Sequence, residues 1–427
     1  MTGTPAISGS STAPRNRRGR DTPAWTVSAG TLAALAVALA MATSSIVFSE
    51  PAVADIMMAA VIVGLPLLGV TRFGPVSILN LTLWLVFVAL GFAACSVSTT
   101  FDTAVTHQAV TLFLALGAFV LAGYVAADPA PRFRLIMTCY VAGCLIAAAA
   151  GIAGYFQIIP SATELFTNYG RARGTFKDPN VLGAALAPAI VYLAWLALRA
   201  RPRHAPFVAA AGLPLMLALL LTFSRGAWAS TALSLLLVAW LALVTTRRAV
   251  DHRRFIAVAA LGTATLVAAI GGALELEAVG GLFEERASLD QSYDEGPDGR
   301  FGGQAKAVGL ILEHPFGIGT HTFRDTYHRE EAHNVYLSQF LNAGWIGGLL
   351  YVISVAGTLA AGVYAIRRRT ALQGPLIVAT VAFAGVVFEG FVIDTDHWRH
   401  FFILMALIWG LTDAEPPVAD PRRRSDD

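Results

Sequence analysis

Long apolar runs recur along almost the whole chain, and they restrict its fold more than any other feature. Each approaches or exceeds the ~20 residues that a helix needs to cross the hydrocarbon of a bilayer. The pattern predicts an all-α, polytopic membrane protein with about twelve transmembrane helices. The runs cover residues 24–48, 52–71, 76–98, 104–127, 133–158, 180–198, 205–223, 226–246, 254–273, 335–366, 371–393 and 398–414.

The composition excludes an ordinary water-soluble globule. The chain of 427 residues is 56% hydrophobic and only 14% charged, so it needs lipid as part of its solvent. Its formal net charge of +2 does not favour a nucleic-acid surface. Cys95, Cys139 and Cys144 lie within apolar runs, at spacings that suggest neither a metal site nor a disulfide framework, which predicts small buried hydrophobic side chains.

The charges between the apolar runs orient the predicted helices. When the N-terminal tail is placed in the cytoplasm, every inside segment carries Lys or Arg, and these segments hold 20 of the 30 basic residues. Both termini are therefore expected on the cytoplasmic side of a bacterial inner membrane. The expected order is a disordered cytoplasmic tail at 1–23, spans one to nine at 24–273, a long periplasmic loop at 274–334, spans ten to twelve at 335–414, and a second cytoplasmic tail at 415–427.

The other basic residues lie in outside segments, against this bias. Insertion into the membrane does not explain cations in these places, so they indicate a function on the outer face. They are Arg171, Arg173, Lys177, Arg225, Arg286, Arg300, Lys306, Arg324, Arg329 and Arg399.

Two groups of these cations are candidates for binding an anion. Arg171, Arg173 and Lys177 fall within seven residues of each other and predict a compact anion site at the membrane surface, although cations that reach lipid headgroups would give the same pattern. Arg225 joins the seventh and eighth spans with almost no loop. It is either a headgroup anchor or a buried ligand contact, and we favour the ligand.

The long outside loop changes from acidic to mixed character at Arg300, and its apolar residues at 305–315 predict a short helix. The loop ends at His333 and Asn334, where the tenth span begins. A histidine there is suited to act as a general base toward a hydroxyl group, although an isolated histidine is more often structural. His328 and His333, with Glu330 and Glu331 between them, could suggest a zinc protease. The two histidines are five residues apart, whereas a zinc-protease helix needs histidines four apart, so the spacing argues against this class.

The last outside segment contains an Asp-x-Asp pair, Asp394 and Asp396, followed by Arg399. Such a pair can hold a divalent cation against a diphosphate, and Arg399 could instead contact the phosphate itself. Pairing among these neighbouring acids and bases explains the segment equally well.

Four motifs in order resemble the O-antigen ligase and polymerase superfamily. The topology and the long outside loop before the last three spans match it as well. The resemblance covers roughly residues 151–410, whereas the first four spans match only in hydropathy. The motifs are R-x-x-G-T-F-x-x-P-N at Arg171–Asn180, S-R-G at Ser224–Gly226, H-P-F-G-I-G-T at His314–Thr320 and H-N-x-Y-L at His333–Leu337.

The resemblance implies a glycosyltransferase-C-like enzyme. It would move a glycan, with inversion, from an undecaprenyl-diphosphate carrier to an acceptor hydroxyl on the periplasmic side. In that family, arginines at the positions matching Arg171 and Arg225 contact the donor diphosphate, and a histidine matching His333 serves catalysis. The family assigns no fixed role to Arg173 and Lys177, which we predict as further diphosphate ligands.

Other residues and the need for a metal stay open at this point. Arg300, Asn334, Asp394, Asp396 and Arg399 are additional candidates for the site. The resemblance implies no resident metal or cofactor, because guanidinium groups can stabilise a departing diphosphate in place of a cation. The Asp-x-Asp segment keeps a divalent cation as an alternative.

The motifs describe the donor site and leave the acceptor open. The expected partners are the lipid-linked donor, membrane lipids and an acceptor, with no nucleic acid. The acceptor would be lipid A core for a ligase, a growing glycan for an exopolysaccharide or O-antigen polymerase, or protein Ser or Thr for an O-oligosaccharyltransferase. We rank the ligase first. A small-anion transporter is a different class, but the sequence has no matching halves with broken helices, and its outside cations lie at the surface.

Overall fold

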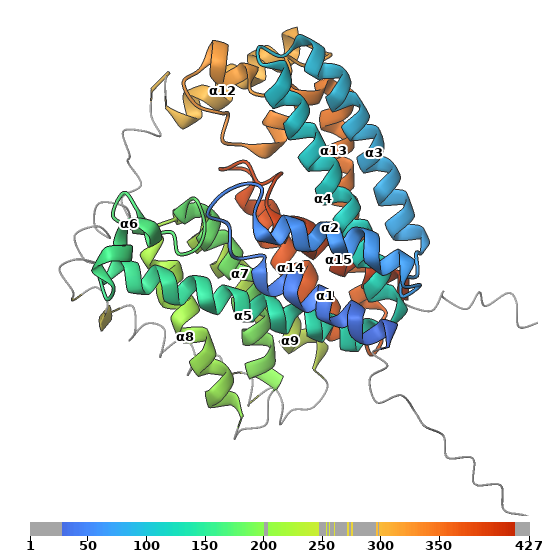
Figure 1. Cartoon of the computed structure of the whole chain (residues 1–427), viewed down its shortest axis with the longest axis vertical. Helices are drawn as coiled ribbons and strands as arrows, with labels where there is room; N and C mark the ends of the chain where they lie inside the picture. Colours follow the sequence, from blue (N-terminus) through green and yellow to red (C-terminus); the bar gives the residue numbers. More distant parts are fainter. Residues whose placement is uncertain are drawn as a thin grey trace, which may run out of the picture.

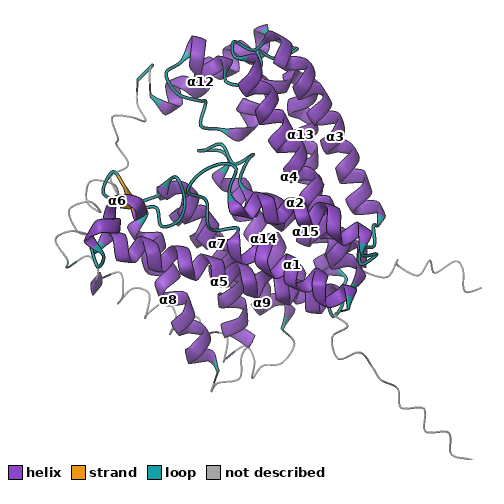
Figure 2. Cartoon of the chain, in the orientation of Figure 1, coloured by secondary structure: helices purple, strands orange, loops and turns teal. Residues whose placement is uncertain are grey.

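Helices form nearly all of the regular structure in the part of the chain that the computed structural model describes (Figure 2). It describes residues 28–199, 204–246, 296–297 and 299–414, together with isolated positions between 253 and 275. The predicted tails, the ninth span and the acidic start of the long loop lie outside the described residues.

The helices follow the predicted apolar runs closely. In the first half they are α1 (Ala29–Thr43), α2 (Val53–Leu67), α3 (Pro75–Ala94), η1 (Cys95–Val97), α4 (Phe101–Ala127), α5 (Pro129–Tyr155), η2 (Pro160–Ala162) and α6 (Thr163–Phe166). A hairpin of β1 (Thr167–Asn168) and β2 (Arg171–Ala172) follows. The remaining helices are α7 (Pro179–Arg199), α8 (Ala205–Leu221), α9 (Arg225–Thr245), α12 (Arg300–Glu313), the π-helical turn η3 (Phe323–Tyr327), α13 (Val335–Arg367), α14 (Gln373–Glu389) and α15 (Arg399–Ala414).

Six of the described helices are long and apolar enough to cross a membrane, and four more are apolar but shorter. This confirms an all-α polytopic membrane protein. The number of twelve spans stays a prediction, because the ninth run lies outside the described residues. The short helix predicted at 305–315 is present as α12, which begins earlier, at Arg300.

Local sequence signals explain where several helices begin. Pro75 and Pro129 occupy the first turns of α3 and α5, where the missing N–H has no partner to lose. The side chains of Ser224 and Asn334 cap α9 and α13 by accepting the N–H groups of Ala227 and Leu337. Two motif residues of the predicted site therefore also define helix ends.

The core is centred on the last two helices. α15 is buried along almost its whole length and packs mainly against α4, while α14 contacts α7, α9, α13 and α15 (Figure 1). Aromatic rings join α3, α13 and α15: Trp84 lies edge-on to Tyr351 at 5.7 Å, and Tyr351 stacks on Phe401 at 6.4 Å between ring centroids. This packing fixes α3, α13 and α15 against one another, and α14 packs beside α13 and α15.

The run at 335–366 is interrupted by a break that the sequence pattern did not predict. Gly344 has φ 72° and ψ −174°, so α13 consists of two helical pieces. The chain at 315–318 fills the break: the Trp345 N–H donates to the Pro315 carbonyl over 2.9 Å, and the Ile318 N–H to the Leu341 carbonyl over 2.8 Å. The H-P-F-G-I-G-T motif is therefore a packing element that positions α12 against the start of α13.

Candidate functional site

The arginine-rich motif forms a tight hairpin. Tyr169 and Gly170 both have positive φ, as a two-residue turn of this kind requires, and Asn168 pairs with Arg171. Arg171 donates from Nε to the Thr222 carbonyl over 2.6 Å and from Nη2 to Asn180 Oδ1 over 2.7 Å. The first and last residues of the motif therefore contact each other, and the arginine reaches the turn before α9.

The backbone conformation and the close packing at Gly174 explain why the motif has a glycine at this position. Its φ is 55°, and an added Cβ would lie 2.3 Å from the Ala147 carbonyl oxygen of α5. The next residue, Thr175, donates from its hydroxyl to the Ser45 carbonyl, and its own carbonyl accepts the Val47 N–H over 2.8 Å. These contacts fix the segment between α5 and the α1–α2 connection.

The S-R-G motif forms the sharp turn between α8 and α9. Thr222 caps the end of α8, Phe223 has φ 47°, and Arg225 is the first residue of α9, half-buried. Arg171 binds the carbonyl three residues before Arg225. The two arginines that the resemblance implies for the diphosphate therefore belong to one junction.

Two motifs meet at the C-terminal end of α14. A methyl group on Gly226 would lie 3.4 Å from both Glu389 Oε1 and Val392 Cγ2. On another side of this end, the Val335 N–H donates to the Gly390 carbonyl over 2.9 Å. The S-R-G turn and the H-N-x-Y segment, about 110 residues apart, thus pack on the same four residues, 389–392.

His333 lies at this junction with its backbone in the left-handed region, at φ 49°. Its Nε2 is 3.2 Å from Glu330 Oε2, and its Nδ1 is 4.0 Å from Asp394 Oδ2. Its backbone N–H donates to the Asp394 carboxylate, and its carbonyl accepts from Gln304 of α12 over 3.3 Å. The half-buried ring is held by elements on both sides.

The surroundings of His333 favour the neutral imidazole. Burial and the positive charge of Arg300 lower its pKa below the ordinary 6.5, although Glu330 and Glu331 act in the opposite direction. Arg300, at the start of α12, is therefore close enough to act on this ring. A neutral imidazole has a lone pair that can accept a proton.

Asp394 and Asp396 turn toward different partners. Asp394 accepts the Ser338 hydroxyl over 2.6 Å, and burial together with the charge of Asp396 raises its pKa to about 7. Asp396 accepts from Gln339 Nε2 over 3.0 Å and lies 3.4 Å from His107 Nε2. Burial alone would raise the pKa of Asp396, but the contact with His107 and the nearby imidazole of His397 lower it.

Three predicted phosphate ligands are engaged elsewhere. Arg173 donates to the carbonyls of Leu165, Glu164 and Lys177, so its guanidinium holds the loop together. Lys177 forms an exposed ion pair with Glu50 at 3.1 Å. Arg399 binds both carboxylate oxygens of Asp55, over 2.9 and 2.7 Å. The roles predicted for these three residues stay predictions.

A cavity of about 210 Å³ lies beside these cations. The α1–α2 connection, the chain around Lys177 and the residues from His397 to His400 line it. His400 is buried, and its Nε2 has no hydrogen-bond partner. The cavity therefore places basic side chains next to the arginine motif.

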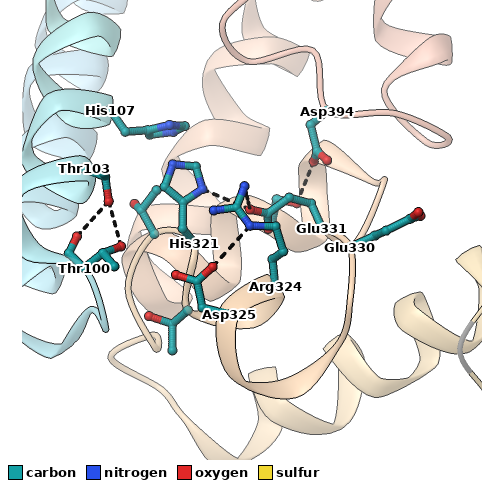
Figure 3. Close-up of polar contacts among 12 residues, drawn as sticks. Thr100, Thr103, His107, His321, Arg324, Asp325, Glu330, Glu331 and Asp394 are labelled. Atoms are coloured by element: carbon teal, nitrogen blue, oxygen red, sulfur yellow. Dashed lines mark hydrogen bonds and ion pairs between the residues drawn. The ribbon is translucent and has the colours of Figure 1, made fainter.

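The sequence analysis missed a group of histidines around Asp396. His107 of α4 lies above His321, and Glu331 and Arg324 lie on the other side of the His321 ring (Figure 3). The position of His107 was a usable signal, since an ionisable residue inside an apolar run is a functional candidate by default. His321 carries no such signal, because it lies in a polar loop.

The fold and the site define a class: a multi-pass helical membrane protein with basic and histidine-bearing loops that meet at the end of one central helix. Within this class, residues 210–352 match the model of the O-antigen ligase family. The match supports the resemblance to the O-antigen ligase and polymerase superfamily of membrane proteins, whose members are membrane glycosyltransferase-like enzymes. It includes Arg225, Arg300 and His333 and begins after Arg171. No curated protein matches the chain.

Proposed function

We propose that the protein transfers a glycan from an undecaprenyl-diphosphate carrier to an acceptor hydroxyl on the periplasmic side of a bacterial inner membrane. One observation carries the proposal: the S-R-G turn and the H-N-x-Y segment pack against the same end of α14, and Arg171 binds the S-R-G turn directly. A diphosphate held at the arginines would therefore be near His333.

The proposed chemistry is a direct displacement. His333 takes the proton of the acceptor hydroxyl, the acceptor oxygen bonds to the anomeric carbon, and the bond from that carbon to the diphosphate oxygen breaks. The electron pair leaves with the diphosphate. Arg171 and Arg225 stabilise the negative charge that develops there, in a site poor in water. A single displacement inverts the anomeric centre.

The neutral state of His333 supports its role as the base. Its lowered pKa keeps the imidazole unprotonated at neutral pH. Asp394, which accepts its backbone N–H, holds the unusual backbone conformation in place. Glu330 lies at hydrogen-bond distance from Nε2 and would stabilise the imidazolium after proton transfer.

We rank transfer to lipid A core first, as the reaction that gives the family its name. A polymerase would use the same donor site and take a growing glycan as acceptor, and a protein O-oligosaccharyltransferase would take Ser or Thr. The outward placement rests on the charge distribution, which puts the loops of the site on the side with few Lys and Arg residues elsewhere.

The test is a transfer assay with the purified full chain. A lipid-diphosphate glycan is incubated with lipid A core, with oligosaccharide and with Ser/Thr peptide as separate acceptors. Wild type is compared with His333→Ala, Arg225→Ala and the control His314→Ala, which changes a histidine in the same loop. We expect transfer to one acceptor, lost in the first two variants and kept in the control.

Two outcomes would overturn the proposal. One is the absence of transfer to every acceptor while the protein moves small anions across liposomes, which would favour the transporter. The other is transfer that persists in both His333→Ala and Arg225→Ala at the rate of the control.

A further inference from the structure

Three side chains from distant parts of the sequence form a compact group outside the proposed transfer site. His107 comes from the second turn of α4, and Asp396 and His397 come from the α14–α15 loop. One ligand atom from each residue lies within 4.8 Å of the other two. His107 Nε2 is 3.4 Å from Asp396 Oδ2, a separation typical of two ligands on one metal ion.

The imidazole rings of His107 and His397 lie against each other. The ring centroids of His107 and His397 are 3.9 Å apart, with the planes inclined by 30°. A third imidazole, His321, lies 5.3 Å from His107 in an edge-on arrangement (Figure 3). Two imidazoles beside one carboxylate are more basic groups than a single acid–base pair needs.

Hydrogen bonds from neighbouring side chains hold Asp396 and His397 in place, as is usual for the ligands of a metal ion. Gln339 Nε2 donates to Asp396 Oδ2 over 3.0 Å. His397 Nε2 lies 2.9 Å from the Thr111 hydroxyl, which leaves its Nδ1 for another partner. Metal-binding histidines and carboxylates commonly have such partners, which fix the ring and the tautomer.

The residue types indicate the kind of ion. Two imidazoles and one carboxylate suit a divalent transition metal such as Zn²⁺, whereas Mg²⁺ and Ca²⁺ prefer oxygen ligands alone. Three protein ligands are also the number found in zinc sites that keep a fourth position for water. The group is only slightly exposed, with the side chains of His107 and Asp396 at 15% and 13%, so an ion there would be shielded from bulk solvent.

We propose that His107, Asp396 and His397 bind one divalent transition-metal ion, which fastens the α14–α15 loop to α4. This site differs from a pair of aspartates that hold a metal against the diphosphate, because Asp394 faces Ser338 and His333 instead. The ion would hold the loop that carries Asp394, and through it the position of His333. The binding itself does not depend on the transfer reaction.

The experiment measures metal on the purified full chain in detergent, without an affinity tag. The protein is stripped with chelator and dialysed, and then loaded with Zn²⁺ or Co²⁺. We expect about one retained ion per chain by elemental analysis, visible absorption of Co²⁺ altered by nitrogen ligands, and an increase in thermal stability that grows with the free metal concentration.

Variants separate this site from non-specific binding. His107→Ala/His397→Ala should retain no ion above background, whereas the control His314→Ala should retain as much as wild type. Gln339→Ala removes only an outer partner and should weaken Zn²⁺ binding by about 10–100-fold. If the double variant does not fold, Gln339→Ala and the Co²⁺ spectrum of wild type still test the site.

The proposal fails if wild type retains no Zn²⁺ and gives no altered Co²⁺ absorption. It also fails if the double variant folds and binds metal as wild type does. Neither result bears on glycan transfer, which is measured separately, so the two proposals can fail independently.

Discussion

Arg171 donates from Nε to the carbonyl oxygen of Thr222 over 2.6 Å, across 51 positions of the sequence. Its Nη2 binds Asn180 at the start of α7. The guanidinium therefore joins the hairpin, the α8–α9 turn and α7 at one point. This contact places the arginine motif beside Arg225. Variants of these arginines can therefore be compared with variants of nearby cations, to distinguish an arginine that binds ligand from one that only supports the fold.

The first prediction concerns the arginine pair. Arg225→Ala and Arg171→Ala should each lower kcat/KM for the lipid-linked donor about tenfold to hundredfold, the equivalent of about 1.5–3 kcal/mol for a lost charged hydrogen bond. Arg171→Lys should restore little, since an ammonium group lacks the planar fork that spans two acceptors. Steady-state kinetics with varied donor measures this.

Two control variants accompany the arginine pair. Lys306→Ala, which removes another cation of the same loop, on α12, should leave the kinetics near wild type. Arg173→Ala should lower thermal stability more than donor binding, because its guanidinium donates to loop carbonyls. Equal kinetic effects of Arg171→Ala, Arg173→Ala and Lys306→Ala would count against a specific diphosphate site.

The second prediction concerns the size of the His333 effect. His333→Ala should lower kcat by on the order of 10²–10⁴-fold, as expected for a lost general base, and change KM for the donor little. Circular dichroism and the melting temperature should stay close to wild type, because the ring is half-buried at the edge of a loop. A loss below tenfold in a well-folded variant would remove the base assignment.

The third prediction concerns the pH dependence. A base works when unprotonated, so activity should rise with pH through the pKa of His333, which lies below 6.5, and then level off. Arg300→Ala removes a positive charge that disfavours the imidazolium, so the pKa rises and the acidic limb moves to higher pH. Glu330→Gln removes a negative charge that favours the imidazolium, so the pKa of His333 falls and the acidic limb moves to lower pH.

The measurement is the pH profile of kcat/KM for wild type and both variants. The opposite directions make the test specific to charge near His333, with Asp394 and Glu331 unchanged in both. Shifts of the same sign in both variants would show that another group controls the limb.

The fourth prediction concerns the Asp55–Arg399 ion pair. Both side chains are about one-fifth exposed and joined by two hydrogen bonds. Asp55→Asn should therefore lower stability by about 1–3 kcal/mol, because it leaves a shielded guanidinium without its charged partner. Thermal unfolding in detergent measures this.

A double-mutant cycle with Arg399→Gln gives the coupling between the two side chains. The cost of the two changes together should be clearly less than the sum of the single costs. Strict additivity would mean that the pair contributes little, and that Arg399 is available for a ligand.

The fifth prediction compares two glycines of α13. Gly344→Ala should destabilise the protein by at least about 1–3 kcal/mol, because φ is 72° and the new Cβ would lie 2.6 Å from the Pro315 carbonyl oxygen. Gly357→Ala, in the same helix with nothing within 4 Å of an added Cβ, should be neutral or stabilising by about 0.5–1 kcal/mol. Thermal unfolding of both variants should give opposite signs.

The membrane class and the helix positions could be predicted from the sequence, which also supplied the candidates Arg171, Arg225 and His333, whose roles stay predictions. The reason is that they depend on local properties: the length of apolar runs, the bias of charges across a membrane, and motifs that are short and continuous. The family match agrees with the resemblance on which those candidates rest.

The tertiary structure decided which side chains meet. Asp394 and Asp396 are two positions apart, yet one faces Ser338 and the other His107, because the loop passes between α13 and α4. Arg399 pairs with Asp55, 344 positions away. Such contacts depend on how long helices pack, and apolar runs of similar composition do not specify their neighbours. The sequence by itself therefore determined the kind of protein and its helices, and packing decided the partners of each charge.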